Sequence, residues 1–362
     1  MKGLLSLGAE ALKSNFQRPP FPFKLTFAVT YRCNSRCATC SIWRRKSKDE
    51  LSLREMEKFF SENRGFRWVA ITGGEPFLRK DLFGICKAMS RTNPLSVVTI
   101  TTNGLLPGRV VKETKRILRL RIPRLILTLS CDGPGPVHDR IRGVPGNFEK
   151  LCGIYSSLRG LQNENFRIFF GFTLSFLNSD QFEPLFSELN SRFPEISYDR
   201  IHANVFHYSP HFYMNRRIPG SWKKKTERAI GEILEKRRFS LLDPLGFLER
   251  KYLEGSVEYL RTGKSPLPCK ACSASLFLDP QGTLYPCTIW DRKLGNIRKD
   301  PRISSLWNSE FAKETAKAAE KLDCPNCWTP CEAYQTISGN FLRAAFWNIP
   351  RRGRKRAQGT RP

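Results

Sequence analysis

The chain has 362 residues, of which 40% are hydrophobic, and its formal net charge is +28. The length suits one large α/β domain with a smaller one beside it, and the composition is that of a globular protein with a buried core. No run of about 18 apolar residues is present, which excludes a transmembrane helix. Glu10 and the lack of a small-residue cleavage site argue against a signal peptide over residues 1–16. The positive charge favours anionic partners, although surface lysines and arginines can also serve solubility alone.

Residues 1–22 are predicted to form a leader. Gly3–Phe16 can form a short amphipathic helix, and Pro19, Pro20 and Pro22 end it. Such a helix can cap one end of a barrel or touch a membrane, and its short apolar face favours capping.

From residue 23 to 211, strand-like and helix-like stretches alternate. Strands are expected at residues 25–29, 68–72, 97–102, 125–130, 167–174 and 201–206, and helices at 52–63, 82–91, 109–119 and 147–159. This alternation predicts a parallel sheet with helical crossovers. The fold class is therefore α/β, and six units indicate an incomplete, TIM-like (β/α)6 barrel. In such barrels the loops at the C-terminal ends of the strands carry the chemistry.

Three cysteines, Cys33, Cys37 and Cys40, lie on the loop that leaves the first strand, in a C-x3-C-x2-C spacing. Three thiolates on one loop can converge on a soft metal centre, either zinc or an iron–sulfur cluster. Three ligands leave one coordination position open, which favours a catalytic site. A structural zinc knuckle is the alternative. The chain has twelve cysteines, and their tight spacings indicate metal ligation in a reducing, cytoplasmic compartment.

This cysteine pattern, with Trp43 shortly after it, resembles the signature of radical S-adenosylmethionine (SAM) enzymes. The resemblance implies that the three cysteines hold a [4Fe-4S] cluster whose fourth iron binds SAM. The motif Gly73, Gly74, Glu75 and Pro76 follows the second strand and resembles the GGEP motif, which binds the amino group of the SAM methionine. Asn103 stands in a Thr-Asn-Gly sequence after the third strand, where the same family positions SAM.

Two further motifs extend this resemblance. Residues 130–133 resemble an S-x-D-G motif, in which Ser130 would face the SAM ribose beside Asp132, and Cys131 is expected in the core. Residues 138–143 resemble an H-D-x-x-R-G motif, whose Arg142 can pair with the SAM carboxylate; a solvated surface charge is the alternative. Asn178, after the fifth strand, is a further adenosine-side residue.

Three of the four histidines fall within ten residues at the end of the sixth strand. Such side chains in a barrel mouth can bind phosphate or move protons, and satisfied structural histidines are the alternative. The predicted substrate residues are His202, Asn204, His207 and His211.

Residues 212–265 form a predicted helical connecting region, and residues 266–335 contain a second set of cysteines. Strands at 276–278 and 283–285 flank an Asp-Pro-Gln-Gly turn and predict a hairpin. The set resembles the SPASM domain, which holds auxiliary [4Fe-4S] clusters. One auxiliary cluster is expected on Cys269, Cys272, Cys287 and Cys331. Cys324 and Cys327 can hold a second, incompletely ligated cluster, or Cys327 can replace Cys331 in the first. A structural zinc is the alternative, and the isolated Cys86 and Cys152 are expected in the core.

Residues 336–362 form a predicted tail, in which a basic run from Arg351 follows the aromatic stretch 341–347. Such a pair can hold a protein at an anionic membrane surface, or the run is a solvated tail.

The resemblance implies reductive cleavage of SAM to a 5′-deoxyadenosyl radical that abstracts hydrogen from a substrate. A reductant such as flavodoxin or ferredoxin is then required. The charge and the histidines favour an anionic small-molecule, cofactor-precursor or lipid-precursor substrate, and peptide or protein modification, as in many SPASM proteins, is the alternative. A third interpretation, a zinc-bound nucleic-acid-binding protein, is supported by the positive charge alone.

Overall fold

The computed structural model describes residues 2–218, 220–237 and 244–347 and confirms the predicted parallel barrel. All six predicted strands are present and pair in parallel in the order β6-β5-β4-β3-β2-β1. Each begins and ends within one residue of the prediction: β1 (Lys24–Ala28), β2 (Trp68–Thr72), β3 (Val97–Thr102), β4 (Arg124–Ser130), β5 (Phe166–Leu174) and β6 (Ile201–Val205).

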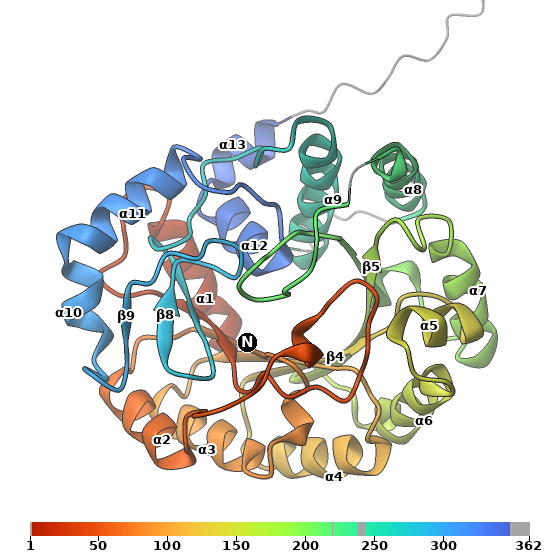
Figure 1. Ribbon diagram of the computed structural model, residues 1–362, viewed down its shortest axis with the longest axis horizontal. Coiled ribbons are helices and arrows are strands. Elements are labelled where there is room, and N and C mark those ends of the chain that lie inside the picture. The colour runs from red at the N-terminus through yellow and green to blue at the C-terminus, as the bar shows by residue number, and fades with distance from the viewer. Residues whose placement is uncertain (1, 219, 238–243, 348–362) are drawn as a thin grey trace, which may run out of the picture.

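Helices cover the outer face of this curved sheet, as Figure 1 shows. They are α2 (Leu53–Glu62), α3 (Leu82–Thr92), α4 (Pro107–Leu118), α5 (Gly135–Arg142), α6 (Asn147–Leu158) and α7 (Phe182–Arg192), followed by α8 (Trp222–Lys236) and α9 (Pro244–Thr262). Helix α2 illustrates why they form: Ser52 and Glu55 make a capping box, and Met56, Phe59 and Phe60 give it one buried apolar face.

Side chains alternate between the two faces of the sheet. Val98 and Ile100 of β3 belong to the main hydrophobic core, whereas Thr99 and Thr101 point the other way, toward the barrel lumen. Thr101 is exposed to solvent although it lies in a central strand. The lumen is therefore polar and open at its C-terminal end. The predicted core positions of Cys86, Cys131 and Cys152 are confirmed.

The C-terminal cysteine-rich region joins the same sheet. The predicted hairpin consists of β7 (Ser275–Leu278) and β8 (Thr283–Tyr285), with β9 (Gly295–Asn296) beside β8. Strand β7 pairs in parallel with β1, so the sheet has nine strands. The helices that follow are α10 (Ile303–Asn308), α11 (Glu310–Glu320), α12 (Pro330–Ser338) and α13 (Phe341–Phe346).

The N-terminal helix α1 (Lys2–Lys13) lies at the N-terminal end of the barrel strands. A Cβ atom at Gly3 would approach Pro123 and Leu95, which precede β4 and β3, so helix and strand ends are in close contact. This position matches the predicted cap. Within the residues described, every helix is too short or too polar to cross a bilayer. The predicted basic run from Arg351 lies outside the described residues.

Candidate active site

The first cysteine loop folds over the C-terminal end of the barrel and is tied to α5. The backbone N–H groups of Arg36 and Ala38 donate to the carbonyls of Arg142 and Ile141, at 3.0 and 2.8 Å. The three predicted thiols gather on this loop, and burial raises the pKa of Cys33 to about 11 and that of Cys40 to about 12, with repulsion from neighbouring thiolates adding to both. Three soft donors with hydrogen-bond donors beside them fit a [4Fe-4S] cluster that keeps one open iron.

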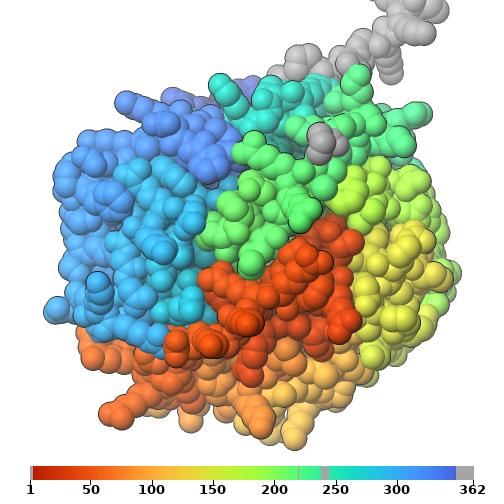
Figure 2. All heavy atoms as spheres, viewed as in Figure 1, coloured from red at the N-terminus to blue at the C-terminus, as the bar shows by residue number. Residues whose placement is uncertain are grey.

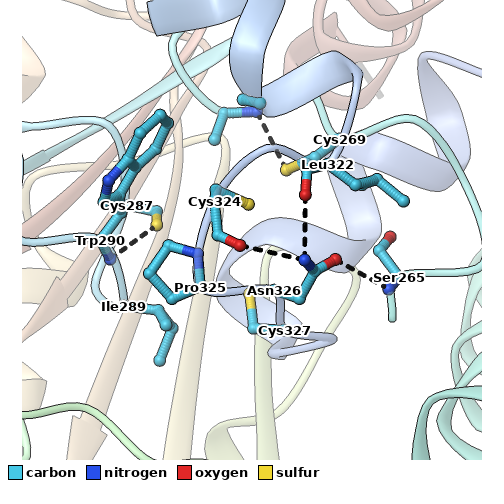
Figure 3. Close-up of a pocket in the computed structure, with 12 residues that line it drawn as sticks. Ser265, Cys269, Cys287, Ile289, Trp290, Leu322, Cys324, Pro325, Asn326 and Cys327 are labelled. Atoms are coloured by element: carbon cyan, nitrogen blue, oxygen red, sulfur yellow. Dashed lines mark hydrogen bonds between the residues drawn. The ribbon is translucent and has the colours of Figure 1, made fainter. Parts of the chain in front are cut away.

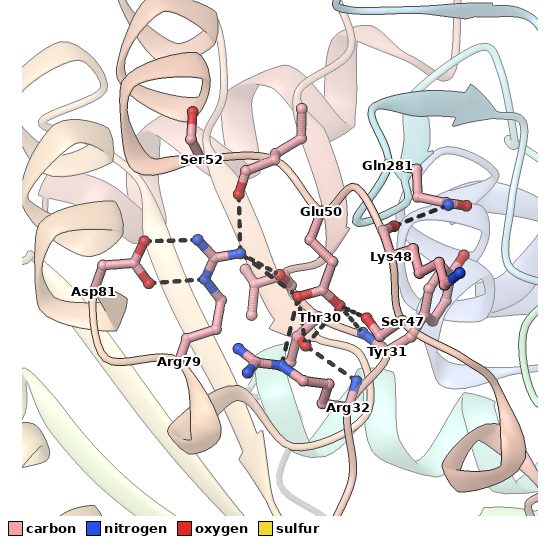
Figure 4. Close-up of polar contacts among 12 residues, drawn as sticks. Thr30, Tyr31, Arg32, Ser47, Lys48, Glu50, Ser52, Arg79, Asp81 and Gln281 are labelled. Atoms are coloured by element: carbon pink, nitrogen blue, oxygen red, sulfur yellow. Dashed lines mark hydrogen bonds and ion pairs between the residues drawn. The ribbon is translucent and has the colours of Figure 1, made fainter.

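Polar side chains hold the chain just before this loop, as Figure 4 shows. The carboxylate of Glu50 accepts hydrogen bonds from the Tyr31 N–H at 2.7 Å and from the Thr30 hydroxyl at 2.8 Å. The buried Arg79 donates to the carbonyls of Val29 and Leu51, at 3.1 and 3.0 Å. No local sequence pattern indicates this network, because its members come from three separate segments.

The Gly-Gly-Glu-Pro motif packs directly against the start of the cysteine loop. The N–H groups of Gly74 and Glu75 donate to the carbonyls of Thr30 and Arg32, at 2.7 and 2.8 Å. A Cβ atom at Gly73 or Gly74 would lie 2.2 Å from one of these same oxygens, so both positions require glycine. Pro76 begins the short 3-10 helix η2 (Pro76–Leu78).

The Glu75 carboxylate is buried and already accepts three hydrogen bonds from the protein. The donors are the Thr102 hydroxyl at 2.8 Å, the Asn103 N–H at 2.7 Å and the Phe77 N–H at 3.0 Å. Burial raises its pKa to about 7 despite these donors. Glu75 therefore fixes the end of β3 beside the cysteine loop.

Asn103 faces the first cysteines. Its side-chain amide donates to the Cys33 sulfur at 3.7 Å and to the Asn34 side chain at 2.9 Å. Its backbone carbonyl accepts from Asn147 at 2.9 Å. Asn147 in turn contacts His138 at 3.0 Å, and the Nδ1 atom of His138 accepts from the Asp132 N–H at 3.1 Å. One chain of hydrogen bonds thus joins the third and fourth strand ends.

Asp132 and Arg142 form a buried ion pair, with 2.8 Å between Oδ2 and Nε. Arg142 also donates to the Cys37 sulfur at 3.8 Å. Asn178 donates to the Asp132 carbonyl at 2.9 Å and lies in the protein interior. Ser130 ends β4, half-buried on the lumen side of the sheet.

A loop after β6, residues 206–218, joins the cysteine loop to the C-terminal region; we call it the bridging loop. Asn215 donates to the Thr39 carbonyl at 3.1 Å, and Ser209 donates to the Thr288 carbonyl at 2.7 Å. The Tyr213 carbonyl accepts from the Ser41 N–H at 2.9 Å. The Tyr213 side chain packs with two small clusters, of which one adjoins Cys33 and Cys40 and the other Cys269 and Cys327. No motif in the sequence indicates this connecting role of Tyr213.

The predicted substrate histidines all have protein neighbours. His202 points into the lumen and pairs with Glu249 of α9 at 3.0 Å. His207 is buried, and its Nε2 accepts from the Trp328 N–H at 2.9 Å; burial lowers its pKa to about 4. The His211 ring packs against Tyr285, with 5.0 Å between centroids. Asn204 faces the lumen, half-buried, at the mouth end of β6.

Four cysteines of the C-terminal region line one cavity, as Figure 3 shows: Cys269, Cys287, Cys324 and Cys327. Backbone N–H groups donate to two of the sulfurs, Ala271 to Cys269 at 3.4 Å and Trp290 to Cys287 at 3.3 Å. Burial raises the pKa of all four thiols, to about 12 for Cys327. Four thiols with N–H···S contacts have the donor chemistry of a fully ligated [4Fe-4S] cluster.

This grouping differs from the predicted set of Cys269, Cys272, Cys287 and Cys331. Cys272 has a backbone φ of 58°, and its thiol turns away to donate to the Ala312 carbonyl at 3.5 Å. Cys331 lies in the first turn of α12 and is not among the residues that line the cavity. Within the residues described, no three metal-binding side chains lie close enough together to hold a single metal ion.

A second cavity, of about 590 Å³, opens between the cysteine loop and the bridging loop. In Figure 2 these orange-red and green segments meet over the barrel mouth. Apolar side chains such as Phe176 and Phe206 line the cavity together with Arg44 and Arg216. Both arginines are exposed, and neither forms an ion pair with a carboxylate of the described residues. The cavity thus offers apolar contact and positive charge beside the three cysteines.

Comparison with protein families supports this site. Residues 27–189 match the model of the radical SAM superfamily, and residues 269–332 match that of the SPASM iron–sulfur cluster-binding domain. These ranges contain both sets of cysteines, and an iron–sulfur domain favours iron over the zinc alternatives.

Among curated proteins, the antilisterial bacteriocin subtilosin biosynthesis protein AlbA of Bacillus subtilis is 26% identical, over 84% of this chain and 66% of its own. A GTP 3′,8-cyclase of Peptoclostridium acidaminophilum is 36% identical over 35% of this chain and 39% of its own. The chain thus spans less than two thirds of the length of these relatives.

Solved structures share the fold at low identity. The anSMEcpe structure with bound AdoMet aligns with a TM-score of 0.58 at 15% identity, covering 90% of this chain and 98% of that one. SuiB of Streptococcus suis bound to its precursor peptide SuiA gives a TM-score of 0.58 at 15% identity, covering 91% and 74%. The two family matches therefore show a radical SAM enzyme: residues 27–189 are its radical SAM region, with SAM and a [4Fe-4S] cluster as cofactors, and residues 269–332 are its C-terminal SPASM domain, with auxiliary iron–sulfur ligation.

Proposed function

We propose that this enzyme modifies a peptide or protein substrate. The observation that carries the proposal is the extent of the match to AlbA, which runs over 84% of this chain, whereas the GTP cyclase matches 35%. AlbA is a bacteriocin biosynthesis protein, and SuiB was solved with a precursor peptide. This proposal takes the place of the small-molecule substrate that the charge and the histidine cluster suggested.

The mouth cavity has the properties that a peptide side chain requires. It lies beside the cysteine loop, it is about 590 Å³ in volume, and its lining combines aromatic, hydroxyl, amide and guanidinium groups. Arg44 and Arg216 come from different loops, so two separate positive charges face the cavity. We infer that they contact a carboxylate or another anionic group of the substrate.

Bound SAM would supply a 5′-deoxyadenosyl radical for hydrogen abstraction at this mouth. We assign Cys33, Cys37 and Cys40 to the SAM-binding cluster. Gly73, Gly74, Glu75, Asn103 and Ser130 would line the SAM site, and the Asp132–Arg142 pair would orient its methionine end.

For the auxiliary site we assign one cluster to Cys269, Cys287, Cys324 and Cys327, the four cysteines that share a cavity. Cys272 and Cys331 would then have structural roles. A flavodoxin or ferredoxin would supply the electron, and the net charge of +28 would favour such acidic partners.

A small anionic molecule is the second candidate substrate, because the two unpaired arginines would suit it equally well. Size-fractionated extract of the source cells distinguishes the two. Anaerobically reconstituted enzyme with dithionite and SAM should form 5′-deoxyadenosine faster when the peptide fraction is added, and protease treatment of that fraction should remove the stimulation.

A stimulating component that resists protease and passes a filter of about 1 kDa would contradict the peptide proposal and support the small-molecule one. The Cys33→Ala/Cys37→Ala/Cys40→Ala variant is the background control, and it should form no 5′-deoxyadenosine in either fraction.

A further inference from the structure

The end of the barrel opposite the cysteine loop carries an exposed apolar stripe. Leu5 and Leu12 of α1 are 71% and 56% exposed, and Phe16, in the turn after α1, is 85% exposed. Positions seven and eleven residues apart fall on one face of a helix and its continuation. On the opposite face Gly3, Ala11 and Ser14 are buried against the protein. Helix α1 therefore packs one face against the protein and exposes a second, apolar face to solvent.

A second apolar surface lies beside the end of α1. Asn15 donates to the Ser338 carbonyl at 2.8 Å, and its side-chain oxygen accepts from the Phe341 N–H at 2.7 Å, so α13 is fastened to this turn. Leu342 and Phe346 of α13 are 61% and 80% exposed. Five large apolar side chains are thus exposed on α1, on the turn that follows it and on α13, and hydrogen bonds join this turn to α13.

Basic side chains surround this end of the barrel. Arg64 precedes β2, and Arg119 and Arg121 precede β4, so all three lie at the N-terminal ends of parallel strands. They are exposed, and none forms an ion pair within the described residues. Glu62 and Glu164 are also exposed here, which leaves the arginines in excess. In sequence, α13 is followed by the basic run from Arg351.

We propose that this face, formed by the exposed side of α1, by α13 and by the arginines at the N-terminal strand ends, docks on an anionic membrane surface. Exposed leucine and phenylalanine side chains would enter the headgroup boundary, and arginines would contact anionic headgroups. An apolar patch ringed by cations matches a negatively charged lipid surface better than it matches another copy of this strongly basic chain. Docked in this way, the barrel mouth would face away from the bilayer.

The proposal is independent of the substrate, and vesicle binding tests it. The full chain is mixed with vesicles of phosphatidylcholine and phosphatidylglycerol (3:1) or of phosphatidylcholine alone, and the bound fraction is measured by sedimentation. We expect binding to the anionic vesicles and at least tenfold weaker binding to the neutral ones. Leu12→Glu/Phe16→Glu should reduce binding to anionic vesicles at least tenfold.

The matched control is Leu177→Glu/Met214→Glu, which adds the same charge at two exposed apolar positions (37% and 39% exposed) at the mouth end of the barrel, one after β5 and one on the bridging loop. This control should bind as the unmodified chain does, and circular dichroism establishes that both variants are folded. Equal losses in the two variants would show binding by net charge alone and overturn the proposal. The proposal would also be overturned if the chain did not bind vesicles and instead formed a dimer that Leu12→Glu/Phe16→Glu dissociates. In that case a second copy of the chain would cover this face.

Discussion

Arg142 is the residue on which most of the site geometry depends. It pairs with Asp132, contacts the Cys37 sulfur and, through its carbonyl, accepts from the Arg36 N–H of the cysteine loop. Because Asp132 is buried, removing the guanidinium would leave an uncompensated carboxylate in the protein interior.

We therefore expect Arg142→Ala to lower the free energy of unfolding by about 3–5 kcal/mol, the usual cost of breaking a buried pair. Urea denaturation of the metal-free protein measures this. Arg140→Ala, on the exposed side of the same helix, is the control and should change stability by less than about 0.5 kcal/mol. Equal stability of the two variants would place the Arg142 charge in solvent.

Glu75 allows a second test at this scale. Its carboxylate accepts from two backbone N–H groups and one hydroxyl, whereas a glutamine would present an NH2 group to one of these donors. We expect Glu75→Gln to displace Asn103 and to weaken SAM binding at least tenfold, in line with the loss of about 1.5–3 kcal/mol for a contact to a charged group.

Equilibrium binding of SAM to the reconstituted enzyme measures this effect, with iron content determined on the same sample. Glu57→Gln, on the exposed face of α2, is the control. Unchanged SAM affinity at unchanged iron content would mean that Glu75 does not shape the SAM site.

At the scale of elements, the loops that carry the C-terminal cysteines make a distinctive prediction. Cys269→Ser and Cys324→Ser should each lower the iron content by about four per chain, because each removes one of four ligands of a single cluster. Cys272→Ser should retain the iron, since its thiol contacts the Ala312 carbonyl and not the cavity.

Iron analysis together with electron paramagnetic resonance in the presence of SAM would separate this cluster from the one on Cys33, Cys37 and Cys40. Loss of iron from Cys272→Ser, with retention in Cys324→Ser, would restore the grouping predicted from the spacing of the cysteines.

The strands could be predicted from the sequence because their signal is local. Apolar residues on alternate positions of β3 and β4 define each strand to within one residue. The cysteine grouping could not, because it depends on the backbone φ at Cys272 and on where α12 begins. The surroundings of the predicted substrate histidines could not be predicted for a related reason: their neighbours, Glu249, Trp328 and Tyr285, are distant in sequence and leave no local pattern.

For the whole molecule, two buried histidines predict sensitivity to acid. Burial lowers the pKa of His138 and of His207 to about 4, below the ordinary value near 6.5. His138 is neutral, with its proton on Nε2, because Nδ1 accepts from the Asp132 N–H. Between pH 6.5 and 4 the unfolded chain therefore binds protons that the folded chain does not, so stability falls as the pH falls through this window.

We expect each histidine to lower the free energy of unfolding by about 3 kcal/mol at pH 4 relative to pH 7.5. Urea denaturation of the metal-free protein across this range measures how the free energy of unfolding changes with pH. His207→Gln should make this change smaller by the contribution of His207. A slope unchanged in His207→Gln would show that this ring is protonated as readily in the folded protein as in the unfolded one.

The parallel pairing of β7 with β1 has a consequence for synthesis of the chain. Lys24 pairs with Ser275, roughly 250 residues later, so one edge of the first strand has no neighbour until the ribosome has made the C-terminal region. At about 5–20 residues per second, this edge stays open for roughly 12–50 s. An open edge can recruit strands from other nascent chains, so this interval is the period of greatest aggregation risk and the one in which a chaperone would protect the protein.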